Sequence, residues 1–220
     1  MDKDLSKAVI KVFVDLYNNK LIYKDKKLVN WDTQLQTAIS DLEVVQKEVQ
    51  SQLYYIDYDL ENSDTKITIA TTRPETMMGD TAIAVNPKDD RYLNLIGKNV
   101  RIPVVNRTIK IIADRYADPE QGSGAVKITP AHDFNDYEVG KRNKLQIINI
   151  FEKDGKINKN GIIEYVGLDR FEARKLLIKQ LKDNGKLVKI ETIKNKVPYG
   201  DRSNTIIEPL LTEQWFVDAK

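Results

Sequence analysis

Two short segments carry most of the side chains that could bind a ligand or catalyse a reaction. The first segment is residues 70–80, ATTRPETMMGD, and the second segment is residues 122–136, GSGAVKITPAHDFND. In each, polar residues and a predicted helix start follow an apolar run. Hydroxyls, a guanidinium, an ammonium and two carboxylates would therefore lie at the ends of rigid elements, where binding and catalytic groups usually sit.

The first segment has two interpretations. Thr72 and Glu75 have the spacing of a capping box, in which Thr72 accepts a backbone N–H and Glu75 reaches back to the helix start. Alternatively, the hydroxyls of Thr71, Thr72 and Thr76 surround Arg73 at a helix N-terminus. Such a cluster suits an oxygen-rich ligand such as a ribose, a phosphate or an ester carbonyl.

The second segment places Asp133 and Asp136 three residues apart, so they share one face of the following helix. Asp133 could simply be the N-cap, with Asp136 favouring the positive helix end. Together with Lys127 and Arg73, however, the two acids could form a pocket for a substrate ammonium group. We expect His132 to pack or hydrogen-bond rather than form a catalytic dyad, because no Ser or Cys nucleophile motif accompanies it.

Composition excludes several kinds of site. The net charge of +2 is not typical of a protein that coats nucleic acid through charge alone. With no Cys and one His, a zinc site of the Cys/His type cannot be built. A Mg²⁺ or Ca²⁺ site made from carboxylates remains open but has no loop signature, so we expect neither a metal nor a cofactor. No apolar run approaches the ~20 residues of a membrane helix, so we expect no membrane association. The absence of Cys, and of a signal-peptide apolar region in residues 1–4, leads us to expect a cytoplasmic location.

The elements that must position these residues indicate an α+β fold that is mainly β. Alternating patterns predict strands at 53–60, 66–71, 81–85, 100–105, 109–113, 125–129 and 145–151. Their even spacing favours a closed or nearly closed barrel over a doubly wound parallel sheet. A few peripheral helices are predicted at 4–18, at 86–97, from Asp133 onward, and at 169–185. In the last of these, Asp169 is the predicted cap and the buried stripe is formed by Phe171, Leu176, Leu177 and Leu181.

The two ends of the chain are predicted to form a β-ribbon, with residues 21–45 pairing with 190–217. Trp31 and Trp215 lie in similar sequence settings within it. Adjacent chain ends are typical of a domain inserted in a larger protein. Lys-rich strings such as residues 24–27 are expected on the solvated surface, with contact to an RNA backbone as the alternative.

Several motifs resemble the inserted editing domain of the class I aminoacyl-tRNA synthetases specific for valine, isoleucine and leucine. TTRPETMMGDTAIAVNP resembles its threonine-rich element, and GSGAVKITPAHDFNDYEVGKR resembles the element with its universal acid. LVNWDTQLQTAISDLEV and TIIEPLLTEQWFV resemble the stalk that joins the insertion to the catalytic core. The valine-specific members are the most similar, because the position of Lys127 is typically His or Met in the other two, and because Arg73 departs from the isoleucine pattern.

The resemblance implies a division into three parts: a helix of the flanking core at 1–20, a stalk at 21–48 and 190–220, and the editing domain at 49–189. It also implies site residues. Asp136 would bind the α-ammonium of the misattached amino acid, while Asp133 and Lys127 would help to position it. The side chains expected to line the pocket near the terminal adenosine are Thr71, Thr72, Arg73 and Thr76.

The function implied is hydrolysis of threonine from mischarged tRNA(Val), with the tRNA 3′ end and the rest of the synthetase as partners. Motifs of the synthetic active site are absent, so amino-acid activation is not expected. Residues 197–203 lack the Cys pair that many relatives carry, which again argues against a metal. A non-catalytic module that binds the tRNA 3′ end or a protein, and a free-standing deacylase, are the alternatives.

Overall fold

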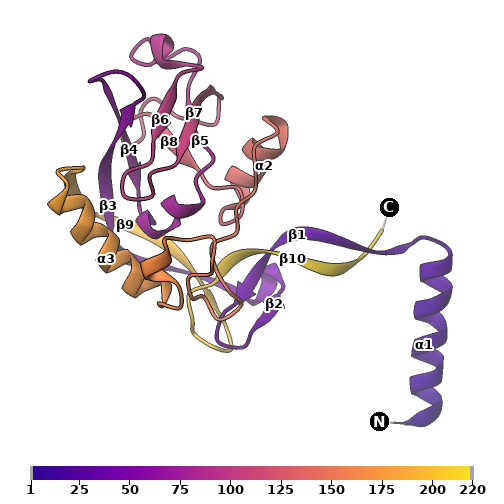
Figure 1. Cartoon of the computed structure of the whole chain (residues 1–220). Helices are drawn as coiled ribbons and strands as arrows, with labels where there is room; N and C mark the ends of the chain where they lie inside the picture. Colours follow the sequence, from indigo (N-terminus) through magenta and orange to yellow (C-terminus); the bar gives the residue numbers. More distant parts are fainter. Residues whose placement is uncertain (1, 219–220) are drawn as a thin grey trace.

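The computed structural model describes residues 2–218 as a β-barrel-like body from which a long ribbon leads to a helix set apart from the body (Figure 1). The predicted α+β, mainly β class is confirmed. Within residues 2–218, no helix is long and apolar enough to cross a membrane.

One sheet forms the barrel-like body. Its strand order is β4-β3-β6-β7-β5-β8, and β4 and β8, at the two ends of this order, lie against each other. All neighbours are antiparallel except β5 and β7. The strands are β3 (Val44–Leu60), β4 (Lys66–Thr71), β5 (Ala82–Val85), β6 (Asn99–Arg101), β7 (Thr108–Ala113) and β8 (Ala125–Ile128). The nearly closed barrel predicted from strand spacing is therefore confirmed.

Two antiparallel ladders carry the body. In the ribbon, β1 (Ile22–Asp32) pairs with β10 (Glu208–Val217), and the short β2 (Thr37–Ile39) joins β1. In the second ladder, β3 pairs with β9 (Leu187–Gly200). The predicted pairing of 21–45 with 190–217 thus corresponds to the β1–β10 ladder, while residues 44–56 pair with 187–200.

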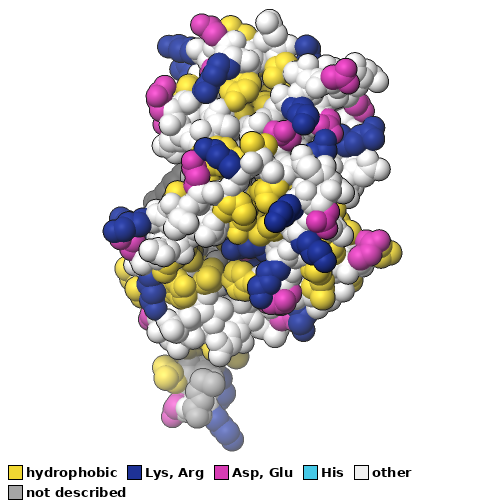
Figure 2. All heavy atoms as spheres, turned by 90° about the vertical axis from the view of Figure 1, so that its left-hand side faces the viewer, with side chains coloured by type: hydrophobic (Ala, Val, Ile, Leu, Met, Phe, Trp, Pro, Cys, Tyr) yellow, Lys and Arg dark blue, Asp and Glu magenta, His cyan; other side chains and the backbone are white. Residues whose placement is uncertain are grey.

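Three α-helices are peripheral. Helix α1 (Lys3–Asn18) contacts the far end of the ribbon, α2 (Phe134–Arg142) follows β8, and α3 (Arg170–Asp183) lies beside η2 (Pro74–Gly79) and β9. Figure 2 shows the face of the body at the left of Figure 1, where basic and acidic side chains are interspersed. Short 3₁₀ turns are η1 (Asp41–Glu43), η3 (Leu93–Leu95) and η4 (Ile163–Tyr165).

Helix α3 begins after its cap Asp169, as predicted, but its buried stripe differs from the prediction. Ala173, Leu177 and Leu181 are buried, whereas Leu176 is 44% exposed. The core that α3 covers is formed by side chains of the barrel strands and η2, such as Ile56, Tyr58, Ile69, Met77 and Ile83. This core fixes the strand ends from which the candidate site is built.

The helix predicted at 86–97 is wrong, since only the 3₁₀ turn η3 forms there. The Asn86 side chain accepts the Lys88 N–H at 3.0 Å, and the Asp89 side chain accepts the Arg91 N–H at 3.1 Å. These local side-chain bonds stabilise turns and compete with helical backbone bonds.

Two strand predictions also need correction. No strand forms at 145–151, apart from one isolated bridge at Phe151. There the Ile150 N–H donates to the His132 ring and the Phe151 N–H to the Asn149 side chain, which replaces ladder bonds. Strand β6 ends at Arg101 rather than at 105, because Val104 adopts a turn conformation with φ of 67°.

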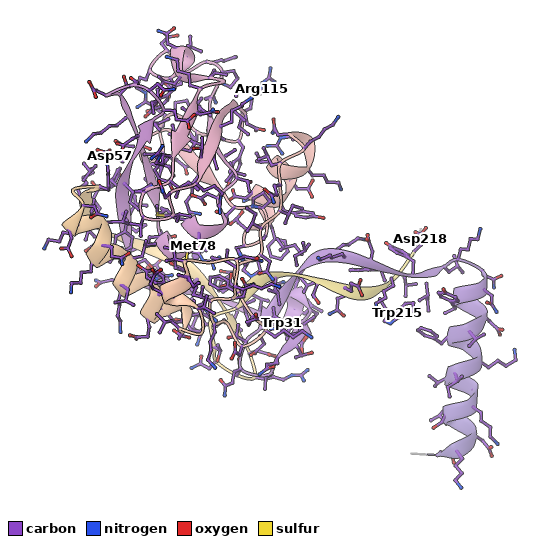
Figure 3. All side chains as sticks on the ribbon, viewed as in Figure 1. Trp31, Asp57, Met78, Arg115, Trp215 and Asp218 are labelled. Atoms are coloured by element: carbon purple, nitrogen blue, oxygen red, sulfur yellow. The ribbon has the colours of Figure 1, made fainter. Side chains whose placement is uncertain are left out.

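The two tryptophans lie in different settings, contrary to the prediction (Figure 3). Trp31 is buried at the base of the ribbon, where its indole N–H donates to the Lys153 carbonyl at 2.7 Å. Trp215 is 51% exposed and contacts the rings of Phe13 and Tyr17 on α1, with ring centroids 5.4 and 6.0 Å apart.

Candidate functional site

The two functional segments meet because the strands that lead into them lie together. Strand β4 ends at Thr71 and leads into η2, while β8 leads through a short loop into α2. They enclose an open pocket of about 990 Å³, which we call the site pocket. All of the predicted site residues line it, namely Thr71, Thr72, Arg73, Thr76, Lys127, Asp133 and Asp136.

Asp133 and Asp136 each accept backbone hydrogen bonds through one carboxylate oxygen and leave the other oxygen without a hydrogen-bond partner among the described residues. Asp133 is the N-cap of α2, and its Oδ1 accepts the N–H groups of Asn135 and Asp136 at 2.8 and 3.0 Å. Asp136 Oδ2 accepts the Thr129 N–H at 2.8 Å. Among residues 2–218 no group hydrogen-bonds Asp133 Oδ2 or Asp136 Oδ1. The capping interpretation of Asp133 is therefore correct, and it does not use up the carboxylate.

The environment of Asp136 disfavours its ionised form. It is only 6% exposed, and burial, followed by the negative charge of Asp133, raises the pKa of Asp136 to about 7, although Lys127 opposes this shift. A positive ligand group would reverse the balance by favouring the carboxylate. Tyr116 also lines the site pocket, and burial together with these two aspartates raises the pKa of its hydroxyl to about 12.

Lys127 is held beneath the site pocket by three oxygen atoms. Its Nζ donates to Thr76 Oγ1 at 2.7 Å, Asp80 Oδ1 at 3.0 Å and Thr129 Oγ1 at 2.5 Å. An ammonium has three donors, so all are occupied. Asp80 is fully buried and also accepts the Tyr58 hydroxyl at 2.7 Å; burial raises the pKa of Asp80, although Lys127 opposes this.

The threonines of the first segment differ in availability, and the predicted capping box is wrong. Thr71 Oγ1 accepts the Arg73 N–H at 3.1 Å, and Thr76 Oγ1 donates to the Arg73 carbonyl at 2.9 Å. Glu75 does not reach back to the helix start but forms a buried bidentate pair with Arg174, with both distances 2.7 Å. The Thr72 hydroxyl has no hydrogen-bond partner among the described residues.

Arg73 connects the two segments. Its Nη1 donates to the His132 carbonyl at 2.8 Å, and its Nη2 donates to both oxygens of Glu208 on β10, at 2.5 and 2.7 Å. The His132 ring is buried, and its Nε2 accepts the Ile150 N–H at 3.0 Å. Burial lowers the pKa of His132, so the neutral ring acts as a packing and hydrogen-bonding group, as predicted.

Gly122 allows a close backbone approach just before β8. A Cβ atom there would lie 2.8 Å from the Cβ of Ala70, and Gly122 has a φ of 59°. Both features favour glycine. The contact brings the loop before β8 against the end of β4, and so it closes one side of the site pocket.

Three polar residues of the site were not singled out by sequence reasoning. Glu208 could have been suspected as an acid within the apolar run 206–211, since such an acid requires a buried partner. Asp80 ends the first segment, but nothing local indicates that it pairs with Lys127. Tyr116 lies in the loop between β7 and β8, without a sequence signal.

The site pocket adjoins a wider groove of about 1170 Å³ between the β3–β9 ladder, the base of the ribbon and α3. Thr72, Arg73, Asp133 and Asn195 line both. An elongated ligand could therefore place one end in the site pocket and extend into the groove. Within residues 2–218 no group of three or more acidic or His side chains is arranged to hold a metal ion.

Comparison with known proteins agrees with the motifs. A family model described as tRNA synthetases class I (I, L, M and V) matches residues 1–220. The chain belongs to this family. It is 71% identical, over its whole length, to valine–tRNA ligase of Pelagibacter ubique (strain HTCC1062), and 56% identical to that of Legionella pneumophila (strain Lens).

The chain spans only about a quarter of the curated relatives that it matches, with 25% and 24% of these two ligases covered. A solved ternary complex, Agrobacterium radiobacter K84 agnB2 LeuRS-tRNA-LeuAMS, aligns with 90% of this chain and 32% of its own, at 18% identity and a TM-score of 0.49. The sequence relatives therefore establish the family, and the site must be argued from its own geometry.

Proposed function

We propose that this chain is the post-transfer editing domain of a valyl-tRNA synthetase, acting in the cytoplasm, and that it hydrolyses the ester of threonine mistakenly attached to tRNA(Val). In this proposal residues 49–189 form the editing domain, 21–48 and 190–220 its stalk, and 1–20 a helix of the flanking core. The observation that carries the proposal is the convergence of all seven predicted site residues on one pocket.

The free oxygens of the aspartates suit an aminoacyl ester. Asp136 Oδ1 would accept the substrate α-ammonium, and the positive charge would favour the ionised state of this buried carboxylate. Asp133 Oδ2 would accept a hydrogen bond from the threonine hydroxyl. Thr72, whose hydroxyl is unpaired among the described residues, would contact the terminal ribose, while Thr71, Arg73 and Thr76 shape the wall behind it.

The proposed chemistry is addition of water to the ester carbonyl carbon without a covalent enzyme intermediate. The tetrahedral oxyanion then collapses, the carbon–oxygen bond to the ribose breaks, and the ribose oxygen leaves with a proton. Free threonine and uncharged tRNA result. The residues contribute by orienting the ester and by the fixed charges around it. Lys127, bonded beneath the pocket, positions Thr76 and Thr129 and adds positive charge next to Asp136.

Editing of threonine has a clear energetic reason. Valine-specific synthetases are known for this problem, because a hydrophobic pocket rejects the isosteric threonine by only ~10²-fold. A second pocket can instead bind the hydroxyl. Valine has no hydroxyl to offer Asp133 Oδ2, so a valyl ester would make one hydrogen bond fewer in this pocket than a threonyl ester. The adjoining groove could receive the tRNA 3′ strand, with the remaining three quarters of the relatives' length supplying further tRNA contacts.

The test is deacylation of purified threonyl-tRNA(Val), with valyl-tRNA(Val) as the matched substrate and the Asp136→Ala protein as the control. We expect threonine release above the protein-free rate, and no formation of aminoacyl-adenylate. Release equal to the protein-free rate at high protein concentration would contradict the proposal. If threonyl-tRNA(Val) then still bound, the alternative of a non-catalytic module for the tRNA 3′ end would be favoured.

A further inference from the structure

One buried carboxylate outside the site pocket contacts both functional segments. Glu208, the first residue of β10, is 2% exposed. It accepts two hydrogen bonds from Arg73 Nη2, and its Oε1 lies 3.6 Å from Nδ1 of His132. Arg73 belongs to the first segment and His132 to the second. A single side chain of the ribbon therefore lies against both.

The bonds of Arg73 extend this contact into the site. Its Nη1 donates to the His132 carbonyl, and its own carbonyl accepts from the Thr76 N–H at 3.1 Å and from Thr76 Oγ1 at 2.9 Å. Thr76 Oγ1 in turn accepts from Lys127 Nζ at 2.7 Å. A continuous chain of hydrogen bonds thus leads from Glu208 to the cation beneath the site pocket.

The position of Glu208 is set by the ribbon. Its backbone pairs with Trp31 on β1. Arg170 Nε lies 3.7 Å from Glu208 Oε2, and the Arg170 guanidinium also donates to Thr33 Oγ1 at 3.1 Å and to the Ile206 carbonyl at 2.8 Å. Thr33 and Ile206 both adjoin the base of the ribbon. The location of the carboxylate therefore follows the location of this base.

We propose that Glu208 is a positioning residue for the proposed deacylation. It does not touch the substrate; it holds the Arg73 guanidinium in the orientation that aligns the two segments, and so couples the ribbon to the site pocket. The proposal rests on the proposed function for the reaction that Glu208 serves. The effect of Glu208 on the alignment of the two segments can be measured by amide hydrogen exchange, which does not depend on the deacylation reaction.

The experiment compares Glu208→Gln and Glu208→Asp with Glu213→Gln as the matched control. Glu213 lies on the same strand, pairs with Lys24 at 2.6 Å and has a side chain that is 64% exposed. All proteins are assayed on threonyl-tRNA(Val) at a temperature where circular dichroism shows them folded. We expect kcat of Glu208→Gln to fall about 100-fold, the usual cost of small misplacements, with KM changed less than about threefold.

The variant Glu208→Asp separates the effect of charge from the effect of side-chain length. Glu208→Asp keeps the charge but is one methylene shorter, so its kcat should lie between those of wild type and Glu208→Gln. If Glu208→Gln does not fold, the comparison is made between Glu208→Asp and Glu213→Gln. The proposal then expects the lower kcat for Glu208→Asp. If Glu208→Gln folds and has the kcat of wild type, Glu208 contributes to folding stability alone and the proposal is overturned. If Glu208→Gln does not fold, the same conclusion follows from a wild-type kcat in Glu208→Asp.

Amide hydrogen exchange provides the second readout. Under conditions where the rest of the barrel stays protected, Glu208→Gln should accelerate exchange in residues 71–80 and 129–136, and Glu213→Gln should not. If Glu208→Gln does not fold, Glu208→Asp takes its place. Unchanged exchange in both segments would overturn the proposed alignment. If wild type does not deacylate threonyl-tRNA(Val), the proposed function fails, and the exchange result alone decides whether Glu208 aligns the segments.

Discussion

Replacing Asp136 by Asn should abolish deacylation and at the same time stabilise the protein at neutral and higher pH. Burial and the charge of Asp133 raise the pKa of Asp136 to about 7, so its carboxylate costs free energy when it ionises in the free protein. Asn can still accept the Thr129 N–H that Asp136 accepts at 2.8 Å, but it carries no charge. Without that charge, the substrate ammonium loses its partner.

The magnitude follows from the two pKa values. In the unfolded chain the carboxyl ionises near its ordinary pKa of 3.8, and in the folded chain near 7. Each pH unit of difference corresponds to about 1.4 kcal/mol, so about 3 units give at most ~4 kcal/mol. Because the folded pKa is raised, the contribution of Asp136 to stability is fully present below pH 3.8, is lost as the pH rises towards about 7, and stays lost above it.

The assay is urea unfolding of wild type and Asp136→Asn from pH 4 to pH 8, with deacylation measured in parallel. The two proteins should have similar unfolding free energies at pH 4, and Asp136→Asn should be the more stable at pH 8. Asp64→Asn, at an exposed position in the β3–β4 hairpin, is the control. A stability difference that does not change with pH would refute the burial argument, and retained deacylation would refute the role of Asp136 in binding the ammonium.

Three further outcomes are expected. Asp133→Ala should lower the ratio of threonyl- to valyl-ester hydrolysis rates, because Asp133 Oδ2 is the proposed acceptor for the threonine hydroxyl; equal slowing of both would leave Asp133 a helix cap only. Asp80→Asn should lower the unfolding free energy by about 3–5 kcal/mol in urea, because Lys127 would be buried without a counter-charge, and a loss below about 1 kcal/mol would contradict this. Burial alone would raise the pKa of Glu208, but Arg73, His132 and Arg170 lower it from 4.5 to about 2, so wild type should lose more stability than Glu208→Gln as the pH falls from about 4.5 to 2; equal losses in acid unfolding would contradict this.

The parts of the fold that the sequence predicted are those set by local pattern. Strands such as 66–71 and 109–113 are half-buried, so alternation between apolar and polar residues follows directly from their environment. The caps Asp133 and Asp169 were recognisable for a similar reason, since a cap bonds to N–H groups only two or three residues away. The site was predictable because its polar residues immediately follow such strands.

The parts that were not predicted depend on partners distant in the sequence. Glu75 has the spacing of a capping residue, yet it pairs with Arg174, which is 99 residues away. Residues 145–151 have the apolar content of a strand, but the His132 ring takes up the N–H of Ile150, which would otherwise join a ladder. In both cases a long-range polar contact overrides a local preference, because leaving a buried polar group without its hydrogen bond costs more than the local preference contributes.

The charged residues of the candidate site differ in how many of their hydrogen bonds are made within the protein. Lys127 directs all three of its donors to protein oxygens, and Arg73 directs three hydrogen bonds to His132 and Glu208. The aspartates Asp133 and Asp136 each bond the protein through one oxygen and keep the other. Among these four residues the cations are bonded to protein oxygens and each acid keeps an oxygen without a protein partner, which favours a positively charged ligand group beside the acids; Arg115 is a further cation that lines the pocket. The α-ammonium of an aminoacyl ester is such a group, whereas a free phosphate would meet two carboxylates and no available cation among these four residues.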